Sequence, residues 1–190
     1  MEWPSRDDSR MSPVRTIGHG NRSAEEFVGL LVGAGVRRLV DVRAVPVSRR
    51  HPQFTREALE RALGAAGIGY EWEGPALGGR RRPAPGSPHL ALHSPAFRAY
   101  ADYMSSAAFK GGLERLVGLA RAEALAIVCA ERLPWQCHRF LVSDALVARG
   151  VAVEHLVDER SRVGHQLSPH VRMSHGALVY DRVTQSDLGL

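Results

Sequence analysis

Residues 124–130 read ALAIVCA, and residues 131–139 continue as ERLPWQCHR. The first stretch is a continuous apolar run, which is typical of a strand buried on both faces of a parallel sheet. The second stretch leads into a helical pattern that runs from about His138 to Arg149, where Gly150 stops it. A buried strand, a polar loop and a helix, in this order, predict an α/β protein.

The rest of the chain repeats this alternation. Further strands are predicted at 14–18, 38–43, 68–72 and 151–157, and helices at 23–35, 55–67, 95–104 and 107–122. We therefore expect an α/β fold in three layers, with a mostly parallel sheet of about five strands and helices on both faces. Residues 74–95 are rich in Gly, Pro and Arg and are predicted to form a long loop, and residues 158–190 have only weak periodicity.

Length and composition predict one domain. The chain has 190 residues, of which 44% are hydrophobic, and this is enough for a core of its own. We expect the domain to cover 14–183, after a disordered leader at 1–13 and before a flexible tail at 184–190. No apolar run approaches the roughly 20 residues of a membrane-spanning helix, and no secretory signal is recognisable at the start. These features predict a cytoplasmic protein with no membrane partner, whose two cysteines are thiols. No feature indicates an oligomeric state.

The charge balance is basic. Lys and Arg total 25 against 20 acidic residues, a net charge of +5, which favours an anionic partner. However, Lys110 is the only lysine, so 24 of the 25 basic residues are arginines. Codon bias in a GC-rich genome is an alternative explanation for that excess.

Ligands of parallel sheets bind beyond the carboxyl ends of the strands, and residues 129–139 lie at such an end. Cys129 ends the buried strand, and His138 and Arg139 open the next helix. Helix N-termini bind anions and lower the pKa of nearby thiols. Glu131 adds a carboxylate and Cys137 a second thiol. The alternative for Cys129 is an inert thiol in the core.

Asp41 lies inside the second predicted strand. A buried carboxylate is costly without a partner, which Arg43, Arg49 or Arg139 can supply. Asp41 is therefore either half of a structural ion pair or an acid/base group, with the arginines left to bind a phosphate or carboxylate.

Two more polar groups are expected at the same end of the sheet. His19 follows the first strand, as a structural or a catalytic histidine. Gly78 and Gly79 precede three arginines, Arg80–Arg82, which are either a solvated run or an anion-binding lid.

A metal site is a further hypothesis. The candidate ligands are Cys129, Glu131, Cys137 and His138. Their spacing matches no closed structural zinc site, but a catalytic iron or zinc site completed by His19 or His165 is compatible with it.

The chain resembles a known family. The phrases TIGHGNRSAEEF, LVDVRAVPVSRRHPQF, GIGYEWEGPALGGR, FRAYADYM, CAERLPWQCHR and ALVARGVAVEHL are similar, in order and spacing, to successive blocks of the DUF488 family from about Val14 to His155. The resemblance implies a three-layer α/β domain of unassigned reaction, with some members linked to iron binding or to DNA-repair and nucleotide contexts. Gly20 stands where the family usually has serine. A DVR strand followed by a strand–Cys–loop–helix unit is also similar to rhodaneses, by analogy only.

The family's signature positions carry over to these residues: His19, Asp41, Arg43, Pro46, Ser48, Arg49, Gly78, Gly79, Cys129, Glu131, Cys137, His138 and Arg139.

These observations predict an enzyme, a hydrolase or transferase, that acts on an anionic small molecule or nucleic-acid component in a cleft at the strand ends. The catalytic candidates are Asp41, Glu131, Cys129 and His19. The substrate-binding candidates are Arg43, Ser48, Arg49, Gly78, Gly79, Arg80, Cys137, His138 and Arg139. The cofactor is unknown, with a metal ion as one option. The alternatives are an iron- or zinc-binding protein and a non-enzymatic nucleic-acid-binding protein that uses the arginine-rich loop.

Overall fold

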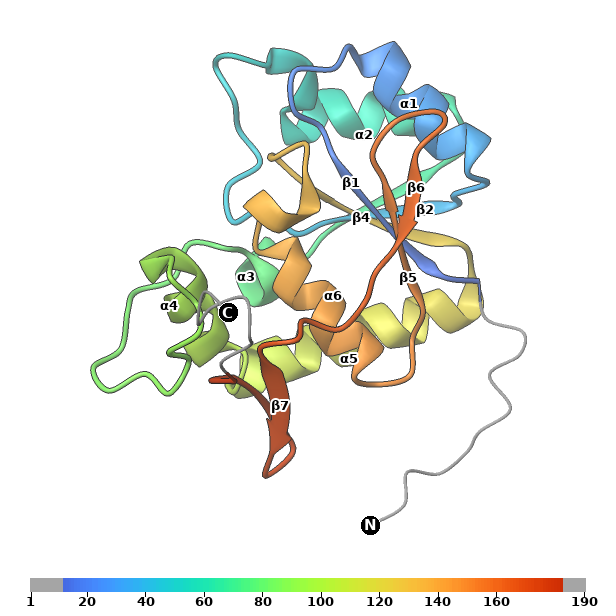
Figure 1. The fold of residues 1–190 in the computed structure, drawn as a ribbon. Helices are drawn as coiled ribbons and strands as arrows, with labels where there is room; N and C mark the ends of the chain where they lie inside the picture. The colour runs from blue at the N-terminus through green and yellow to red at the C-terminus, as the bar shows by residue number, and fades with distance from the viewer. Residues whose placement is uncertain (1–11, 183–190) are drawn as a thin grey trace.

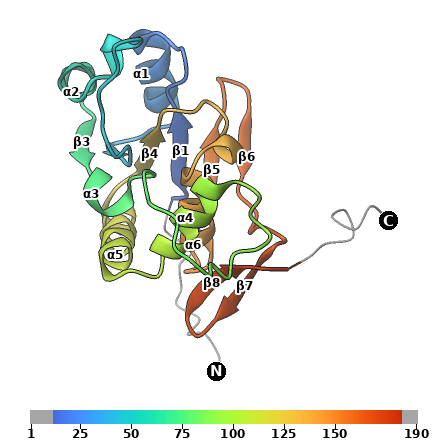
Figure 2. The same ribbon diagram turned by 90° about the vertical axis from the view of Figure 1, so that its left-hand side faces the viewer.

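The central sheet has six strands among residues 12–182, the part of the chain that this computed structural model describes. Their order is β3 (Gly69–Trp72), β2 (Arg38–Asp41), β4 (Leu125–Cys129), β1 (Val14–Gly18), β5 (Val153–Leu156) and β6 (Arg162–Gly164). The first five are parallel, and β6 adds an antiparallel edge to β5 (Figure 2). The prediction of an α/β fold with a mostly parallel sheet is confirmed.

Helices cover both faces of this sheet (Figure 1). One face carries α1 (Ala24–Gly33) and α2 (Arg56–Ala65), and its core includes Phe27, Leu31 and Leu59. The other face carries α5 (Ala107–Ala122) and α6 (Arg139–Val147), with α3 (Gly74–Leu77) and α4 (Pro95–Tyr103) beside them. Two short 3-10 helices, η1 (Pro52–Phe54) and η2 (Pro134–Gln136), lie in the loops that precede α2 and α6.

Strand β2 ends at Asp41, earlier than the predicted Arg43. The reason is local: the backbone N–H of Arg43 bonds to the Asp41 carboxylate at 3.0 Å, so the chain turns there. The predicted loop at 74–95 also differs, because it begins with α3 and has no helix or strand from 78 to 94.

The C-terminal region contains more structure than its weak periodicity indicated. After β6, a hairpin forms from β7 (Val171–Ser174) and β8 (Ala177–Tyr180). Buried Asp144 in α6 anchors this region, because it accepts hydrogen bonds from the Tyr180 hydroxyl at 2.9 Å and the Ser168 N–H at 2.9 Å. Strands this short, anchored to α6 through one buried carboxylate, leave little periodic signal.

The topology places one set of strand ends together. β4 lies between β1 and β2, which are consecutive in the chain, so the carboxyl ends of all three meet at one edge. Backbone bonds from His19 N to Cys129 O at 3.0 Å and from Val42 N to Val128 O at 3.1 Å extend the pairing beyond the strands. In doubly wound sheets this is where ligands bind.

The described residues contain no helix with the length and apolar character needed to cross a bilayer. The predicted leader at 1–13 lies outside the described residues except for 12 and 13, and the predicted tail at 184–190 lies outside them entirely.

Candidate functional site

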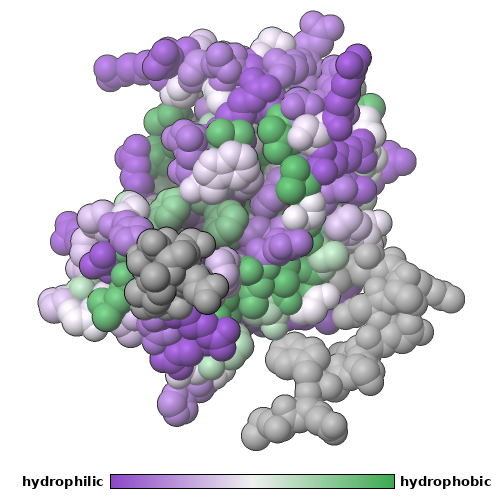
Figure 3. Space-filling view, viewed as in Figure 1, coloured by the Kyte–Doolittle hydropathy of each residue, from purple (hydrophilic) through white to green (hydrophobic). Residues whose placement is uncertain are grey.

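A cavity of about 460 Å³ opens at the carboxyl ends of β1, β2 and β4. Its walls come from His19 after β1, the loop after β2, Gly79 and Arg80, the start of α4, and the segment from Cys129 to His138. In the view of Figure 1, the surface carries hydrophobic patches between hydrophilic side chains (Figure 3). The volume lies within the range of small-molecule sites, about 300–1,000 Å³.

Two thiols and one imidazole meet in the wall of the cavity. The Sγ atoms of Cys129 and Cys137 each lie 3.6 Å from Nδ1 of His138, and all three residues are buried. The loop between the two cysteines folds back through η2, which brings a residue eight positions later against the strand end. We call Cys129, Cys137 and His138 the thiol–imidazole cluster.

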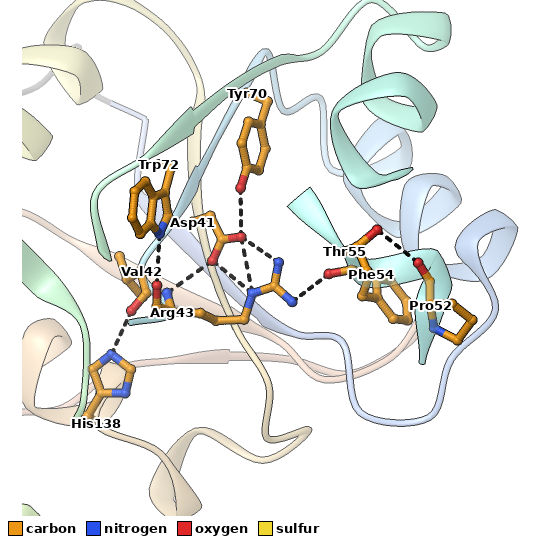
Figure 4. Close-up of polar contacts among 9 residues, drawn as sticks. All are labelled: Asp41, Val42, Arg43, Pro52, Phe54, Thr55, Tyr70, Trp72 and His138. Carbon is orange, nitrogen blue, oxygen red and sulfur yellow. Dashed lines mark hydrogen bonds and ion pairs between the residues drawn. The ribbon is translucent and has the colours of Figure 1, made fainter. Parts of the chain in front are cut away.

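The ring of His138 is held in one orientation. Nε2 donates a hydrogen bond to the Val42 carbonyl at 3.1 Å (Figure 4), which leaves the Nδ1 lone pair directed at the sulfurs. The ring of Tyr100 packs edge-on against it at 4.9 Å. A Cβ placed on Gly79 would lie only 2.5 Å from Nδ1, so glycine is needed for the loop to approach the imidazole.

The two thiols differ in acidity. A hydrogen bond from Cys137 lowers the pKa of Cys129 in opposition to burial, and the charge of Arg139 acts in the same direction as that bond. Burial raises the pKa of Cys137 far above its ordinary value, and its bond to Cys129 adds to the shift. Of the two thiols, Cys129 therefore gives up its proton first.

His19 is buried in the cavity wall, stacked on Phe54 with 4.5 Å between ring centroids. Its Nδ1 donates to the Gly20 carbonyl at 2.9 Å, so Nε2 is the unprotonated nitrogen of the neutral ring. Burial lowers the pKa of His19 to about 4. No hydrogen bond from Nε2 to another described residue is found, so this nitrogen can accept a proton from a bound molecule.

Asp41 is fully buried beneath the cavity and does not line it. Its oxygens accept hydrogen bonds from Arg43 Nε at 2.9 Å and from the Tyr70 hydroxyl at 2.8 Å (Figure 4). Arg43 also donates from Nη1 to the Phe54 carbonyl at 2.7 Å. Burial alone would lower the pKa of Arg43, but its bonds to Asp41 outweigh burial and raise it. The pair therefore forms a rigid, charge-compensated support that fixes the loop after β2.

The rim of the cavity is basic. Arg50 and Arg80 are exposed and line it, and neither forms an ion pair with any residue from 12 to 182. Glu131, also exposed, is the one acidic residue that the described part of the chain contributes to the lining. Ser48 accepts a hydrogen bond from the His51 N–H at 2.9 Å and shapes the loop that carries Arg50.

Three predicted substrate-binding residues lie away from the cavity lining. Arg49 is exposed outside it, and Gly78 packs against Ala44 and Gly74. Arg139 is buried and donates to the carbonyls of Glu131 and Arg132, so it organises the loop between the two cysteines.

The loop between the cysteines also depends on a glycine in β1. A Cβ on Gly18 would lie 1.7 Å from the Glu131 carbonyl oxygen, so this loop crosses the end of β1 at a distance that only glycine permits.

Three of the four candidate metal ligands lie close together. Among the described residues, the group with ligand atoms within 4.8 Å of one another consists of Cys129, Cys137 and His138. Glu131 is not in it, and His165 lies in a separate buried network. There His165 Nε2 lies 3.0 Å from Asp144 Oδ1, His155 Nε2 lies 2.9 Å from His165 Nδ1, and Thr16 Oγ1 lies 2.7 Å from His155 Nδ1.

Sequence reasoning missed several contributors to the cavity. Arg50 lines it where Arg49 was expected, and no pattern in the run SRRH separates these neighbours. Val45, Val47 and Phe97 provide apolar walls, although Val47 is 68% exposed. The register partner of Asp41 on β3 is Trp72, and Tyr70 lies two residues earlier, on the same face of the sheet as Trp72. A side chain as long as that of tyrosine can reach a diagonal neighbour across two strands, so Tyr70 was a candidate partner for the buried carboxylate.

A second cavity of about 330 Å³ lies between α5, α6 and the β7–β8 hairpin. It is lined mainly by apolar residues such as Phe109 and Leu178, and no cysteine or histidine among the described residues lies in its lining. The reactive side chains are therefore concentrated in the first cavity.

Comparison with known proteins identifies one family. The model of the family described as "Domain of unknown function DUF488" matches residues 23–146, which is more than half of the chain. No curated protein gives a significant match. No solved structure gives one either.

Proposed function

The chain belongs to the DUF488 family, and from the geometry of its cavity we propose that it is an enzyme acting on a small anionic substrate, as a hydrolase or transferase. The single observation that carries this proposal is the convergence in one cavity of His19, the thiol–imidazole cluster and two arginines that form no ion pair within residues 12–182. That cavity lies at the carboxyl ends of the strands, where α/β enzymes place their reacting groups.

Arg50 and Arg80 support an anionic substrate. Both are free to form charge-assisted hydrogen bonds with a phosphate or carboxylate. Arg43 contributes little net charge because Asp41 compensates it. Of the arginine run at 80–82, Arg81 donates to the Gly78 carbonyl at 2.9 Å and its guanidinium lies 3.6 Å from the centre of the Tyr103 ring. Arg81 keeps its charge but is held against the protein, so Arg80 and Arg82 are the exposed arginines of this run.

The apolar walls favour a substrate with a flat apolar part as well as a charge. Val45, Val47 and Phe97 line the same cavity as the two arginines. An aromatic ring and aliphatic side chains can pack against a nucleobase, while the arginines bind the phosphate. A nucleotide or a nucleic-acid component combines these two features.

His19 and the thiol–imidazole cluster lie deeper than the arginines, whereas Glu131 lies at the rim with them. His19 presents the unprotonated Nε2 described above, and Glu131 places a carboxylate at the rim; these two can accept and donate protons during the reaction. The thiol–imidazole cluster is the reactive centre of the buried wall. Asp41 is assigned a positioning role through Arg43, in place of acid/base catalysis.

The test is a turnover screen of the full-length protein. Ribonucleotides, deoxyribonucleotides and a short single-stranded oligonucleotide are incubated with it, with and without zinc, and products are quantified by chromatography. We expect product with at least one of these, and a loss of about 100-fold in His19→Gln and in Glu131→Gln. The matched controls, His93→Gln and Glu57→Gln, change exposed residues outside the cavity and should retain the rate. Absence of product with every compound, or full rates in both cavity variants, would contradict the proposal.

A further inference from the structure

We propose that the thiol–imidazole cluster binds a zinc ion through the two Sγ atoms and Nδ1 of His138, with the fourth coordination position open to the cavity. The three ligand atoms lie within 4.8 Å of one another, and all three residues line the cavity. Two cysteines and one histidine with an open position form a known type of catalytic zinc site.

The spacing of the ligand atoms fits a tetrahedral ion. Zinc–sulfur bonds of about 2.3 Å and zinc–nitrogen bonds of about 2.05 Å, at the tetrahedral angle, place sulfur and nitrogen about 3.6 Å apart. Nδ1 of His138 lies 3.6 Å from the Sγ of Cys129 and 3.6 Å from the Sγ of Cys137. An ion can therefore enter between the three atoms without a rearrangement of the sulfur–nitrogen distances.

The hydrogen bonding around the imidazole supports the same conclusion independently. A histidine that binds a metal usually donates its other ring N–H to a backbone carbonyl or carboxylate. His138 does this, because Nε2 donates to the Val42 carbonyl at 3.1 Å. Both sulfurs lie 3.6 Å from Nδ1, so a cation between the three atoms can bind the Nδ1 lone pair and both sulfurs at once.

The ligand chemistry favours zinc. Thiolates and imidazole are the preferred ligands of zinc, whereas non-haem iron(II) sites are built from two histidines and a carboxylate. Glu131 does not belong to the group. Two thiolates would balance the charge of the ion within a buried wall, where an uncompensated charge is costly. Three protein ligands and an open fourth position distinguish this arrangement from a structural zinc site, which has four protein ligands.

The open position connects this inference with the proposed enzyme. A bound zinc ion can polarise an oxygen atom of the substrate or activate a water molecule. That catalytic part rests on the proposed function, whereas zinc binding itself does not.

The experiment uses untagged, full-length protein, stripped with a chelator, equilibrated with zinc chloride and desalted. Elemental analysis should find about one zinc per wild-type chain, and little in Cys137→Ser and His138→Ala. The control His93→Ala changes an exposed histidine outside the cavity and should retain the ion. Wild-type protein that retains no more zinc than Cys137→Ser would overturn the inference.

A second measurement needs only the wild-type protein, so a variant that fails to fold does not affect it. Cobalt(II) replaces zinc in the wild-type chain, and coordination by thiolate gives an intense ligand-to-metal charge-transfer absorption. Its absence in cobalt-equilibrated, folded wild-type protein would also overturn the inference. Neither readout needs a substrate. Zinc bound without turnover contradicts only the proposed function, and turnover that survives complete removal of metal contradicts only the catalytic role of the ion.

Discussion

At the end of β2, Nε of Arg43 donates a hydrogen bond of 2.9 Å to Oδ1 of Asp41, which lies two residues earlier in the chain. The same carboxylate also accepts the Arg43 backbone N–H and the Tyr70 hydroxyl. One buried charge pair therefore both ends the strand and directs the following loop over the cavity.

Asp41→Asn should destabilise the protein strongly, because it leaves the buried guanidinium of Arg43 without its counter-charge. Removing one partner of a buried ion pair costs about 3–5 kcal/mol, while Tyr70→Phe removes a single hydrogen bond and should cost about 1 kcal/mol. Urea unfolding of the two variants and the wild type measures both free energies. Equal stabilities for Asp41→Asn and Tyr70→Phe would refute the structural role given to the pair.

Gly79→Ala should disturb the cluster without unfolding the chain. The new methyl group would lie 2.5 Å from Nδ1 of His138, so the imidazole or the loop has to move, and zinc affinity should fall by about 10-fold or more. Gly118→Ala is the matched control, because nothing lies within 4 Å of its added Cβ in α5. That change should leave zinc affinity unaltered and stabilise the helix by up to about 1 kcal/mol. Zinc titration of both variants measures the two affinities. Equal zinc affinities for Gly79→Ala and Gly118→Ala would show that Gly79 is not needed for close packing against His138.

The buried histidine network should make stability depend on pH. Burial, with the charges of His165 and Arg139, lowers the pKa of His155 from 6.5 to about 3. At pH values between these two pKa values, His155 is protonated in the unfolded chain but neutral in the folded protein. Stability should therefore fall as pH drops below about 6.5, by at most about 1.4 kcal/mol per pH unit for this group.

His155→Gln should flatten that dependence. His19 and His89 also have a lowered pKa, so the informative quantity is the difference in slope between variant and wild type. Urea unfolding at pH 7, 6 and 5 measures it, and His93→Ala serves as a control with an exposed histidine. An identical slope in wild type and His155→Gln would mean that the pKa of His155 does not change on folding.

How far sequence patterns predict this molecule depends on whether an interaction is local. The strand before Cys129 and the helix after His138 were predictable because apolar runs and periodicity extend over many residues. The grouping of Cys129 with Cys137 and His138 at the cavity was predictable from the strand-end rule.

Interactions between distant residues were not predictable. The pairing of Asp144 with Tyr180 and His165 depends on where the last strands pack, and this leaves no periodic trace in so short a segment. The choice of Arg50 over Arg49 depends on the direction of one side chain in a loop. Arg139 appeared as a ligand for an anion because it opens a helix, but it donates instead to two backbone carbonyls.

The most direct test of the proposed function is calorimetric titration of adenosine 5′-monophosphate into the wild type and two double variants. Arg50→Ala/Arg80→Ala removes the arginines that line the cavity, and Arg49→Ala/Arg82→Ala removes the same charge from exposed neighbours outside it. We expect saturable binding to wild type, weakened about 10-fold or more by the first pair of substitutions and changed less than about 2-fold by the second. No binding to wild type, or equal weakening by both pairs, would contradict an anion site in this cavity.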